Sequence, residues 1–296
     1  MGKLYISNSL VKYLFLNGNE RPNICPKQVF SKFVIKNYPD SPTRCMLDGK
    51  YFETLCLGSS SRGDKQLDLP RLNNGNKGVT QLRIEKQVLL FKLLCEKYQI
   101  RVNEHNTQTV YYKEWHKDRR VILRAEMDIA PTTILRNIDN QGEALWLSII
   151  DLKLTVNINS DWGEFGWGDY ANMDKTQGMF YQYMWRDMDV DFNISESGET
   201  WYESFRTGFM KELIEKKLFL FYYWVFSHAK TGMDHQKLCR VVWDKAKELD
   251  LHEAIRKTVS LMELWNEEGF KANPSYEACK DCKLENCKEK TTEEEG

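Results

Sequence analysis

The sequence predicts an α/β protein, because strongly helical and strongly strand-like segments both occur in it. Residues 80–98 (TQLRIEKQVLLFKLLCEKY) repeat apolar residues with the 3.6-residue period of a helix. Residues 121–130 and 144–156 are rich in β-branched and large apolar residues, which is typical of strands. Residues 137–142 between them have the composition of a turn. We therefore expect a mixed central sheet of about four or five strands flanked by helices, with a mostly helical C-terminal part.

The remaining segments are predominantly of helical type. Residues 1–38 are expected to be helical, with a break near 17–23. Another helix should begin at Asp40-Ser41-Pro42, because proline suits a first turn, and should end at Gly58. Residues 173–186 are expected to be helical, and residues 203–267 are expected to form two or three amphipathic helices.

We expect two domains from this length of chain. Residues 1–200 would form the α/β core with its N-terminal helices. Residues 201–296 would form a helical region whose C-terminal cysteines pack back on the N-terminus.

Composition excludes a general electrostatic attraction to polyanions. The 296 residues carry 42 Lys and Arg against 43 Asp and Glu, a net charge of −1, so binding to nucleic acid would need a local basic patch. The longest apolar run, Leu218–Phe226, is too short to span a bilayer. The segment MGKLYISNSLVKY lacks the apolar stretch of a signal peptide. We expect an intracellular, cytoplasmic protein without a membrane partner.

Two carboxylates and a lysine are predicted to meet on the strand pair. Asp151 and Lys153 share one face of their strand, with Leu152 on the other face. A tight turn centred near residues 139 and 140 would place Asp128 nearly opposite Asp151. Neighbouring carboxylates repel each other unless a proton or a cation lies between them, and hard oxygen ligands suit Mg²⁺ or Mn²⁺. The simpler alternative is a salt bridge at the end of a strand.

Four sequence pieces occur in a characteristic order. They are Gly49 to Glu53, Asp128, Asp151-Leu152-Lys153, and Gln177 to Tyr181, matching G-x-x-x-(H/E), D, D-x-K and Q-x-x-x-Y. The series resembles the PD-(D/E)xK nuclease superfamily, specifically its RecB-like exonuclease branch. The resemblance covers roughly residues 1–190 and the C-terminal cysteines. It implies a restriction-endonuclease-like core. Judged alone, Glu53 would be expected to be an exposed helix residue.

The resemblance also implies a metal site. Glu53, Asp128 and Asp151 would hold Mg²⁺ or Mn²⁺, with the carbonyl oxygen of Leu152 as a further ligand. Lys153 would orient the attacking water or stabilise charge on the phosphate.

Two residues of the following helix complete the implied catalytic set. Gln177 would position Lys153 or the phosphate, and Tyr181 would support DNA contact or packing. The implied function is a metal-dependent deoxyribonuclease, an exonuclease acting on single-stranded or duplex DNA ends in repair, recombination or phage and defence DNA processing. A helicase or recombination protein would be its partner. The alternative is a catalytically silent nucleic-acid-binding or scaffolding protein on the same fold.

Three cysteines lie together near the C-terminus: Cys279, Cys282 and Cys287. A tetrahedral metal site or a cubane cluster needs four ligands, and Cys25 is the candidate fourth. In RecB-like nucleases of the AddB and CRISPR-associated exonuclease types, one N-terminal and three C-terminal cysteines hold a [4Fe–4S] cluster, so the resemblance implies one here. The C-x2-C-x4-C spacing is one residue shorter than that family's usual pattern. Zn²⁺ and free thiols are the alternatives.

Local features that suit nucleic acid are present but not decisive. Residues 92–124 carry eight Lys or Arg against four acids, and residues 206–257 carry eleven against seven. Either stretch could line a phosphate channel or form ordinary solvated surface. An aromatic segment follows the second strand and could stack on unpaired bases or cap the core; it contains Trp162, Phe165, Trp167 and Tyr170.

Overall fold

The computed structural model describes most of the chain, in two compact units that are treated separately below. We call residues 43–113 and 124–244 the sheet unit, and residues 1–42, 114–123 and 245–296 the terminal unit. In the described part of the chain, no helix is long and apolar enough to cross a membrane. The described residues are 3–16, 19–20, 23–39, 42–58, 76–104, 106–115, 117–138, 142–162, 175–186, 219–229, 236–273, 275–279, 282–284 and 287.

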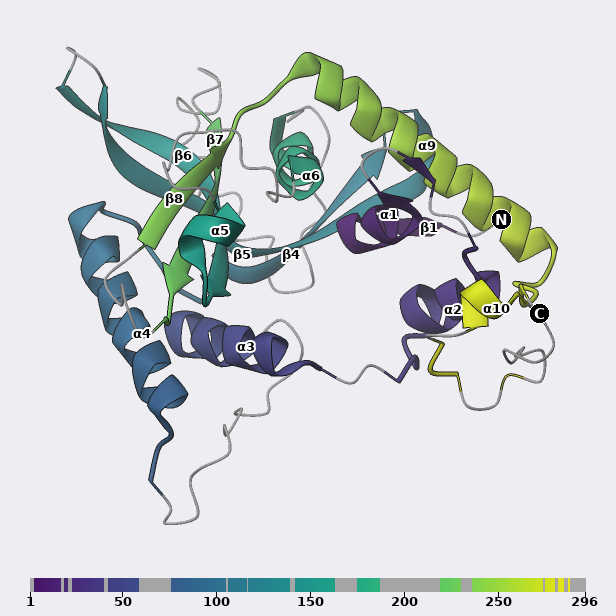
Figure 1. Ribbon diagram of the computed structural model, residues 1–296. Helices are drawn as coiled ribbons and strands as arrows, with labels where there is room; N and C mark the ends of the chain where they lie inside the picture. Colours follow the sequence, from purple (N-terminus) through teal and green to yellow (C-terminus); the bar gives the residue numbers. More distant parts are fainter. Residues whose placement is uncertain are drawn as a thin grey trace. The chain divides into compact units, whose positions relative to one another are not determined.

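A six-stranded mixed sheet organises the fold (Figure 1). The strand order is β1-β5-β6-β7-β8, and β4 also pairs with β5. The β5–β6 and β7–β8 pairs are antiparallel, whereas β6 and β7 run parallel. The predicted α/β class, a mixed sheet flanked by helices, is confirmed, with six strands instead of four or five. The strands are β1 (Leu4–Ser7), β4 (Thr107–Trp115), β5 (Asp118–Ile138), β6 (Gly142–Thr155), β7 (Phe219–Ser227) and β8 (Gln236–Val241).

The additional strands include two in the segment expected to be entirely helical. Within residues 203–267 only α9 (Lys245–Glu267) is a described helix, and β7 and β8 precede it, so the helical prediction was wrong there. The β7 sequence, FLFYYWVFS, is apolar almost throughout because the strand is buried on both faces. Such a strand lacks the alternation that distinguishes strand from helix.

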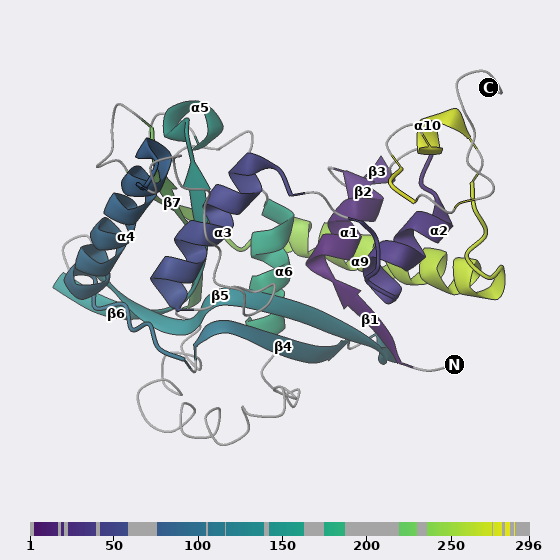
Figure 2. The ribbon, with the colours of Figure 1, turned by 90° about the horizontal axis from the view of Figure 1, so that it is seen from below.

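Two helices cover one face of the sheet within the sheet unit (Figure 2). In α3 (Arg44–Leu57), Thr43 caps the first turn, and Gly58 ends the helix with a left-handed φ of 79°. This end was predicted, whereas the start lies after Pro42. The predicted helix over residues 80–98 is α4 (Val79–Lys97). Phe52 of α3 packs on Phe226 at 5.1 Å between ring centroids, and Phe91 of α4 packs on Trp224 at 5.3 Å.

The opposite face of the sheet receives α6 (Lys175–Arg186), which confirms the helix predicted over residues 173–186. Tyr181 of α6 contacts Phe221 at 5.9 Å between ring centroids. Phe221 alternates along β7 with Tyr222 and Trp224, which belong to the core cluster with α3 and α4. The buried Lys113 of β4 donates a hydrogen bond to the carbonyl oxygen of Tyr183 at 2.9 Å, which connects α6 to β4.

The N-terminal segment is less helical than expected. Within residues 1–38 the structure has β1, α1 (Asn8–Leu14), the short hairpin β2 (Phe15–Leu16) and β3 (Asn19–Glu20), α2 (Pro26–Val29) and one π-helical turn, Phe30–Val34. Ser7 caps α1 by accepting a hydrogen bond from the backbone N–H of Leu10 at 3.2 Å, which is why the helix begins there.

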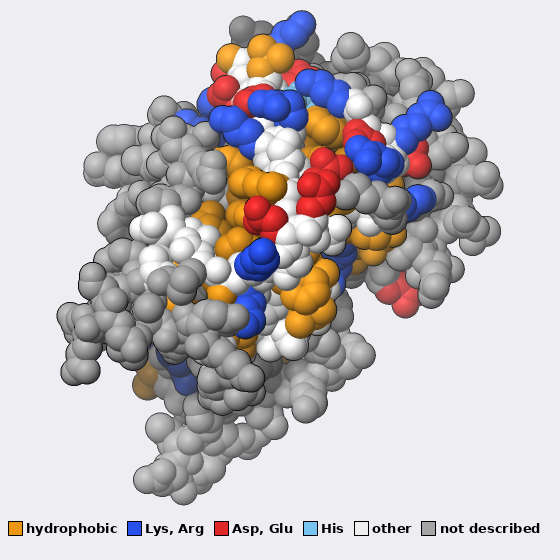
Figure 3. All heavy atoms as spheres, turned by 90° about the vertical axis from the view of Figure 1, so that its right-hand side faces the viewer, with side chains coloured by type: hydrophobic (Ala, Val, Ile, Leu, Met, Phe, Trp, Pro, Cys, Tyr) orange, Lys and Arg blue, Asp and Glu red, His pale blue; other side chains and the backbone are white. Residues whose placement is uncertain are grey.

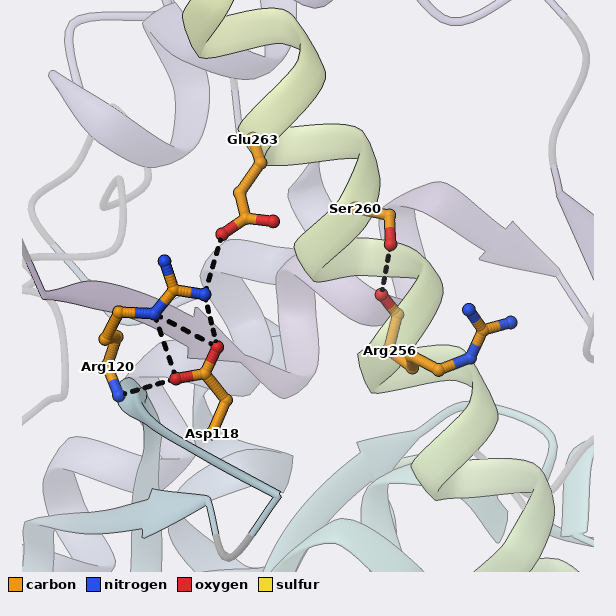
Figure 4. Close-up of polar contacts among 5 residues, drawn as sticks. All are labelled: Asp118, Arg120, Arg256, Ser260 and Glu263. Atoms are coloured by element: carbon orange, nitrogen blue, oxygen red, sulfur yellow. Dashed lines mark hydrogen bonds and ion pairs between the residues drawn. The ribbon is translucent and has the colours of Figure 1, made fainter. Parts of the chain in front are cut away.

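Within the terminal unit, α9 contacts the first residues of β5 (Figure 4). Arg120 pairs with Asp118 at 2.6 Å and reaches Glu263 of α9 at 3.3 Å. These exposed ion pairs contribute little to stability. The buried contact between Trp115 and His252, with the indole N–H donating to Nδ1 at 3.2 Å, anchors the helix better.

On the face that Figure 3 shows, the described charged side chains do not form a patch of only one sign of charge. There, the described Lys and Arg side chains lie among Asp and Glu side chains and apolar ones. Several expected features fall outside the described residues: the central residues 139–141 of the predicted turn, the aromatic residues Phe165, Trp167 and Tyr170, and the boundary at residue 200, which stays a prediction.

The close approach of α6 to β8 gives a testable prediction. A Cβ atom on Gly178 would lie 2.8 Å from Cγ2 of Val241, so Gly178→Ala should push the helix from the sheet although alanine is the better helix former. We expect a loss of about 1–3 kcal/mol in the free energy of unfolding, measured by denaturant titration. The double variant with Val241→Ala should recover most of it, and no recovery would contradict the steric explanation.

Candidate active site

Adjacent strands place Asp128 and Asp151 together. The antiparallel register pairs Ile129 with Ile150, so the next step along β5 and β6 brings Asp128 opposite Asp151. The Oδ2 atom of Asp128 accepts a hydrogen bond from the backbone N–H of Leu152 at 2.7 Å. The sequence-based prediction that these two acids are neighbours is thus confirmed.

Lys153 supplies a positive charge to the same sheet face. Its Nζ atom forms an ion pair with Oδ2 of Asp151 and lies 5.6 Å from the ring centroid of Tyr223. Burial lowers the pKa of Lys153, but attraction from Asp151 and Asp128 outweighs this effect and raises the pKa above its ordinary value. The ammonium group therefore stays charged at neutral pH.

The α6 helix buttresses the acids with Gln177 and Tyr181. The Nε2 atom of Gln177 donates to Oδ1 of Asp151 at 2.7 Å, and it lies 3.2 Å from the hydroxyl of Tyr181. Tyr181 donates in turn to the backbone carbonyl of Glu126 at 2.8 Å. The two α6 residues therefore fix the orientation of Asp151 and tie α6 to β5. Gln177 contacts Asp151, the ion-pair partner of Lys153; its predicted role in positioning Lys153 or the phosphate stays a prediction.

Glu53 approaches the same site from α3. Its Oε1 atom accepts a hydrogen bond from Nε2 of Gln108. Burial raises the pKa of Glu53, and the charge of Asp151 raises it further, while Lys153 opposes the shift. Glu53 is therefore close enough to Asp151 and Lys153 of β6 for their charges to act on its carboxylate.

Asp128 is a buried carboxyl group with two other acids nearby. Burial raises its pKa well above the ordinary value, and repulsion from Asp151 and Glu53 adds to the shift. The nearby Glu126 differs because its side chain is 25% exposed and lies 3.4 Å from Arg124. Glu126 and Arg124 therefore form a partly exposed ion pair next to the site.

The donor chemistry of the three acids suits a hard divalent cation, although their present orientations are set by other partners. Across the described residues, no three His, Cys, Asp or Glu side chains stand in position to hold a metal ion. The Asp151 oxygens contact Lys153 and Gln177, while Asp128 and Glu53 accept hydrogen bonds from an amide N–H and Gln108. Small side-chain rotations would be needed for carboxylate oxygens to converge on a cation.

The four cysteines of the second predicted site all belong to the terminal unit. Cys25 precedes α2 as its N-cap residue, and its Sγ accepts a hydrogen bond from the backbone N–H of Asn273 at 3.4 Å. The carbonyl oxygen of Asn273 lies 4.0 Å from Sγ of Cys279. The backbone N–H of Cys282 donates to the carbonyl of Cys279 at 3.0 Å, and Cys287 is half-buried. Asn273 thus brings the predicted N-terminal ligand near one C-terminal ligand.

Two site residues were missed by sequence reasoning. Gln108 contacts Glu53, and Tyr223 lies against Lys153 with its hydroxyl 3.4 Å from Oε1 of Gln177. Tyr223 faces Asp151 in the parallel β6–β7 register, a pairing of segments far apart in the chain. Tyr223 was missed because its segment was interpreted as helix and because its pairing with Asp151 leaves no local signal in the sequence.

Comparisons with known proteins leave the family open. No family model matches the chain, and no curated protein matches it either. Among solved structures, it is similar to a crystal structure of a "putative exonuclease" from Eubacterium rectale, with 14% sequence identity and a TM-score of 0.45, over 94% of this chain and 86% of that one. A likeness this distant carries no argument about function.

The clustered acids predict an unusual stability profile. Because the pKa of Asp128 is raised on folding, metal-free protein should lose stability as pH rises from the unfolded value, about 4, through the raised folded value. Asp128→Asn keeps an oxygen that can accept the N–H of Leu152 and removes the charge. We expect the variant to melt about 2–4 °C higher than the wild type at pH 7 in EDTA, measured by calorimetry.

The same comparison at acidic pH is the control. There Asp128 is already protonated, so the two proteins should melt at similar temperatures. A variant that is less stable than the wild type at pH 7 would show that the Asp128 carboxylate is not a destabilising charge.

Proposed function

We propose that this protein is a divalent-metal-dependent nuclease that hydrolyses phosphodiester bonds in DNA, acting as an exonuclease. The observation that supports it best is the juxtaposition of Asp128 and Asp151 on paired strands, with Lys153 beside them and Gln177 holding Asp151.

Charge balance favours a metal site over an isolated salt bridge. Glu53, Asp128 and Asp151 can carry three negative charges, and Lys153 carries one positive charge. Arg124 already balances Glu126. When ionised, the group therefore has two negative charges in excess, which a single Mg²⁺ or Mn²⁺ would neutralise.

The proposed metal ligands are Glu53, Asp128 and Asp151, together with the carbonyl oxygen of Leu152. A divalent cation held there would supply Lewis-acid stabilisation of the phosphate's negative charge. The residues of the chain would do the rest. Lys153 would stabilise the charge that develops on the phosphate oxygens and orient the attacking water, while Gln177 and Tyr181 keep Asp151 in place.

Removing the lysine charge tests this division of roles. Lys153→Met should lower nucleotide release from end-labelled DNA about 10²–10³-fold in Mg²⁺ or Mn²⁺, because one preorganised charge is lost. The exposed Lys86 on α4 gives the matched control, and Lys86→Met should leave the rate unchanged.

Asp151→Asn tests the metal itself. The variant should lose both activity and the rise in melting temperature that Mg²⁺ or Mn²⁺ gives the wild type, because a metal ligand is gone. Wild-type protein that leaves single strands, duplex ends and nicked circles intact in both metals would contradict the nuclease proposal and favour the silent DNA-binding alternative.

We further propose that Cys25, Cys279, Cys282 and Cys287 hold a [4Fe–4S] cluster, with Zn²⁺ as the alternative. Thiolates are the ligands that both prefer. Cys25 caps the start of α2, and the Asn273 N–H donates to its sulfur. Closing a loop of roughly 250 residues would restrict the unfolded chain and stabilise the fold by a few kcal/mol.

Elemental analysis of anaerobically purified protein distinguishes these possibilities. We expect about four iron and four acid-labile sulfide per chain, lost in Cys279→Ser, and a lower melting temperature for that variant. The matched control is Cys45→Ser, because Cys45 is an exposed cysteine of the sheet unit. One zinc per chain would support the alternative, and metal-free protein would contradict a metal site at these cysteines.

We also propose that the nuclease acts in repair, recombination or phage and defence DNA processing, with a helicase or recombination protein as its partner.

A further inference from the structure

An aromatic side chain packs on Tyr223, the tyrosine that also contacts the lysine of the proposed active site. Trp162 ends the short helix α5 (Ile158–Trp162), which follows β6 after Asp151 and Lys153. Its ring packs on Tyr223 with 5.3 Å between centroids and an interplanar angle of 55°. Trp162 remains partly exposed, whereas Tyr223 is fully buried.

Tyr223 contacts both Trp162 and the ammonium group of Lys153. The same tyrosine ring has Nζ of Lys153 at 5.6 Å from its centroid, and its hydroxyl is 3.4 Å from Oε1 of Gln177. Trp162 and Lys153 therefore share one buried neighbour. A partly exposed indole and a cation thus contact the same buried tyrosine ring.

This pairing matches the two parts of a nucleotide. The ammonium group of Lys153 suits a phosphate, and the indole of Trp162 suits the flat face of a base, whatever the base is. In duplex DNA the faces of an internal base are stacked and a terminal base is held in its pair. A base that is unpaired is therefore the one expected to stack on the indole.

We propose that Trp162 is a stacking platform for an unpaired base next to the scissile phosphate, so that the enzyme acts on single-stranded or frayed DNA ends. This inference rests on the proposed nuclease function, because it assigns the phosphate to Lys153. Trp162 is a substrate-binding residue in this arrangement, and Tyr223 positions it.

The test separates stacking from simple cover of Tyr223. Trp162→Leu keeps an apolar cover and removes the aromatic face, whereas Trp162→Tyr keeps an aromatic face. The probe is a phosphorothioate single strand carrying terminal 2-aminopurine, whose fluorescence falls when it stacks. It is titrated in Ca²⁺ beside a blunt duplex of the same sequence.

We expect wild-type protein and Trp162→Tyr to quench the probe. Trp162→Leu should lose the quenching and bind the single strand about tenfold more weakly, with duplex binding unchanged. The control is Trp243→Leu, a half-buried tryptophan that follows the end of β8; it should behave as wild type.

Quenching that persists in Trp162→Leu, or equal weakening of single-strand and duplex binding, would overturn the stacking proposal. Hydrolysis by the wild type in Mg²⁺ or Mn²⁺ is measured separately. If the wild type hydrolyses DNA but quenching does not depend on Trp162, only the stacking inference fails. If quenching depends on Trp162 but no DNA is hydrolysed, the platform stands and the nuclease proposal fails.

Discussion

Repulsion between the carboxylates of Asp128 and Asp151 is the constraint around which the sheet unit is built. Two paired strands hold these acids together although burial and like charge raise the pKa of Asp128 well above its ordinary value. The surrounding polar groups offset the cost: Lys153 and Gln177 contact Asp151, and the Leu152 N–H contacts Asp128. Strongly shifted pKa values of this kind cluster at functional sites, which is the reason for placing the proposed function here.

Side chains alternate between the two faces of each strand, and this alternation separates the carboxylate site from the apolar core. On β6, Leu152 joins the apolar cluster under α3 and α4, while Asp151 and Lys153 point to the side of α6. On β7, Trp224 enters the apolar cluster and Tyr223 lies against Lys153. A shift of one residue in the β6–β7 register would bury the charges in the core, so apolar packing also fixes the geometry of the site.

The features that sequence predicted are those encoded locally. The hairpin pairing of Asp128 with Asp151 follows from two strand-like segments and a short turn, and α4 follows from its apolar period. The parallel β7 strand was missed because a strand buried on both faces has no alternation, and its pairing with β6 joins segments about 70 residues apart. Tyr223 and its contacts with Lys153 and Trp162 were therefore beyond reach, as was the Gln108 contact with Glu53. The metal roles of Glu53, Asp128 and Asp151 and the cluster at the four cysteines stay predictions.

Protons and a divalent cation would compete for the same excess charge. At acidic pH the raised pKa values of Glu53 and Asp128 let protons neutralise the site, which then needs no metal. As pH rises, these protons leave, the charge excess grows toward two, and affinity for a doubly charged ion grows with it. The raised pKa of Lys153 keeps its ammonium charged over the same range. In the proposed function, the protein would hold one fixed positive charge for a phosphate and leave the remaining negative charge for a cation from solution. An ordinary salt bridge of one acid and one base cannot divide its charges in this way.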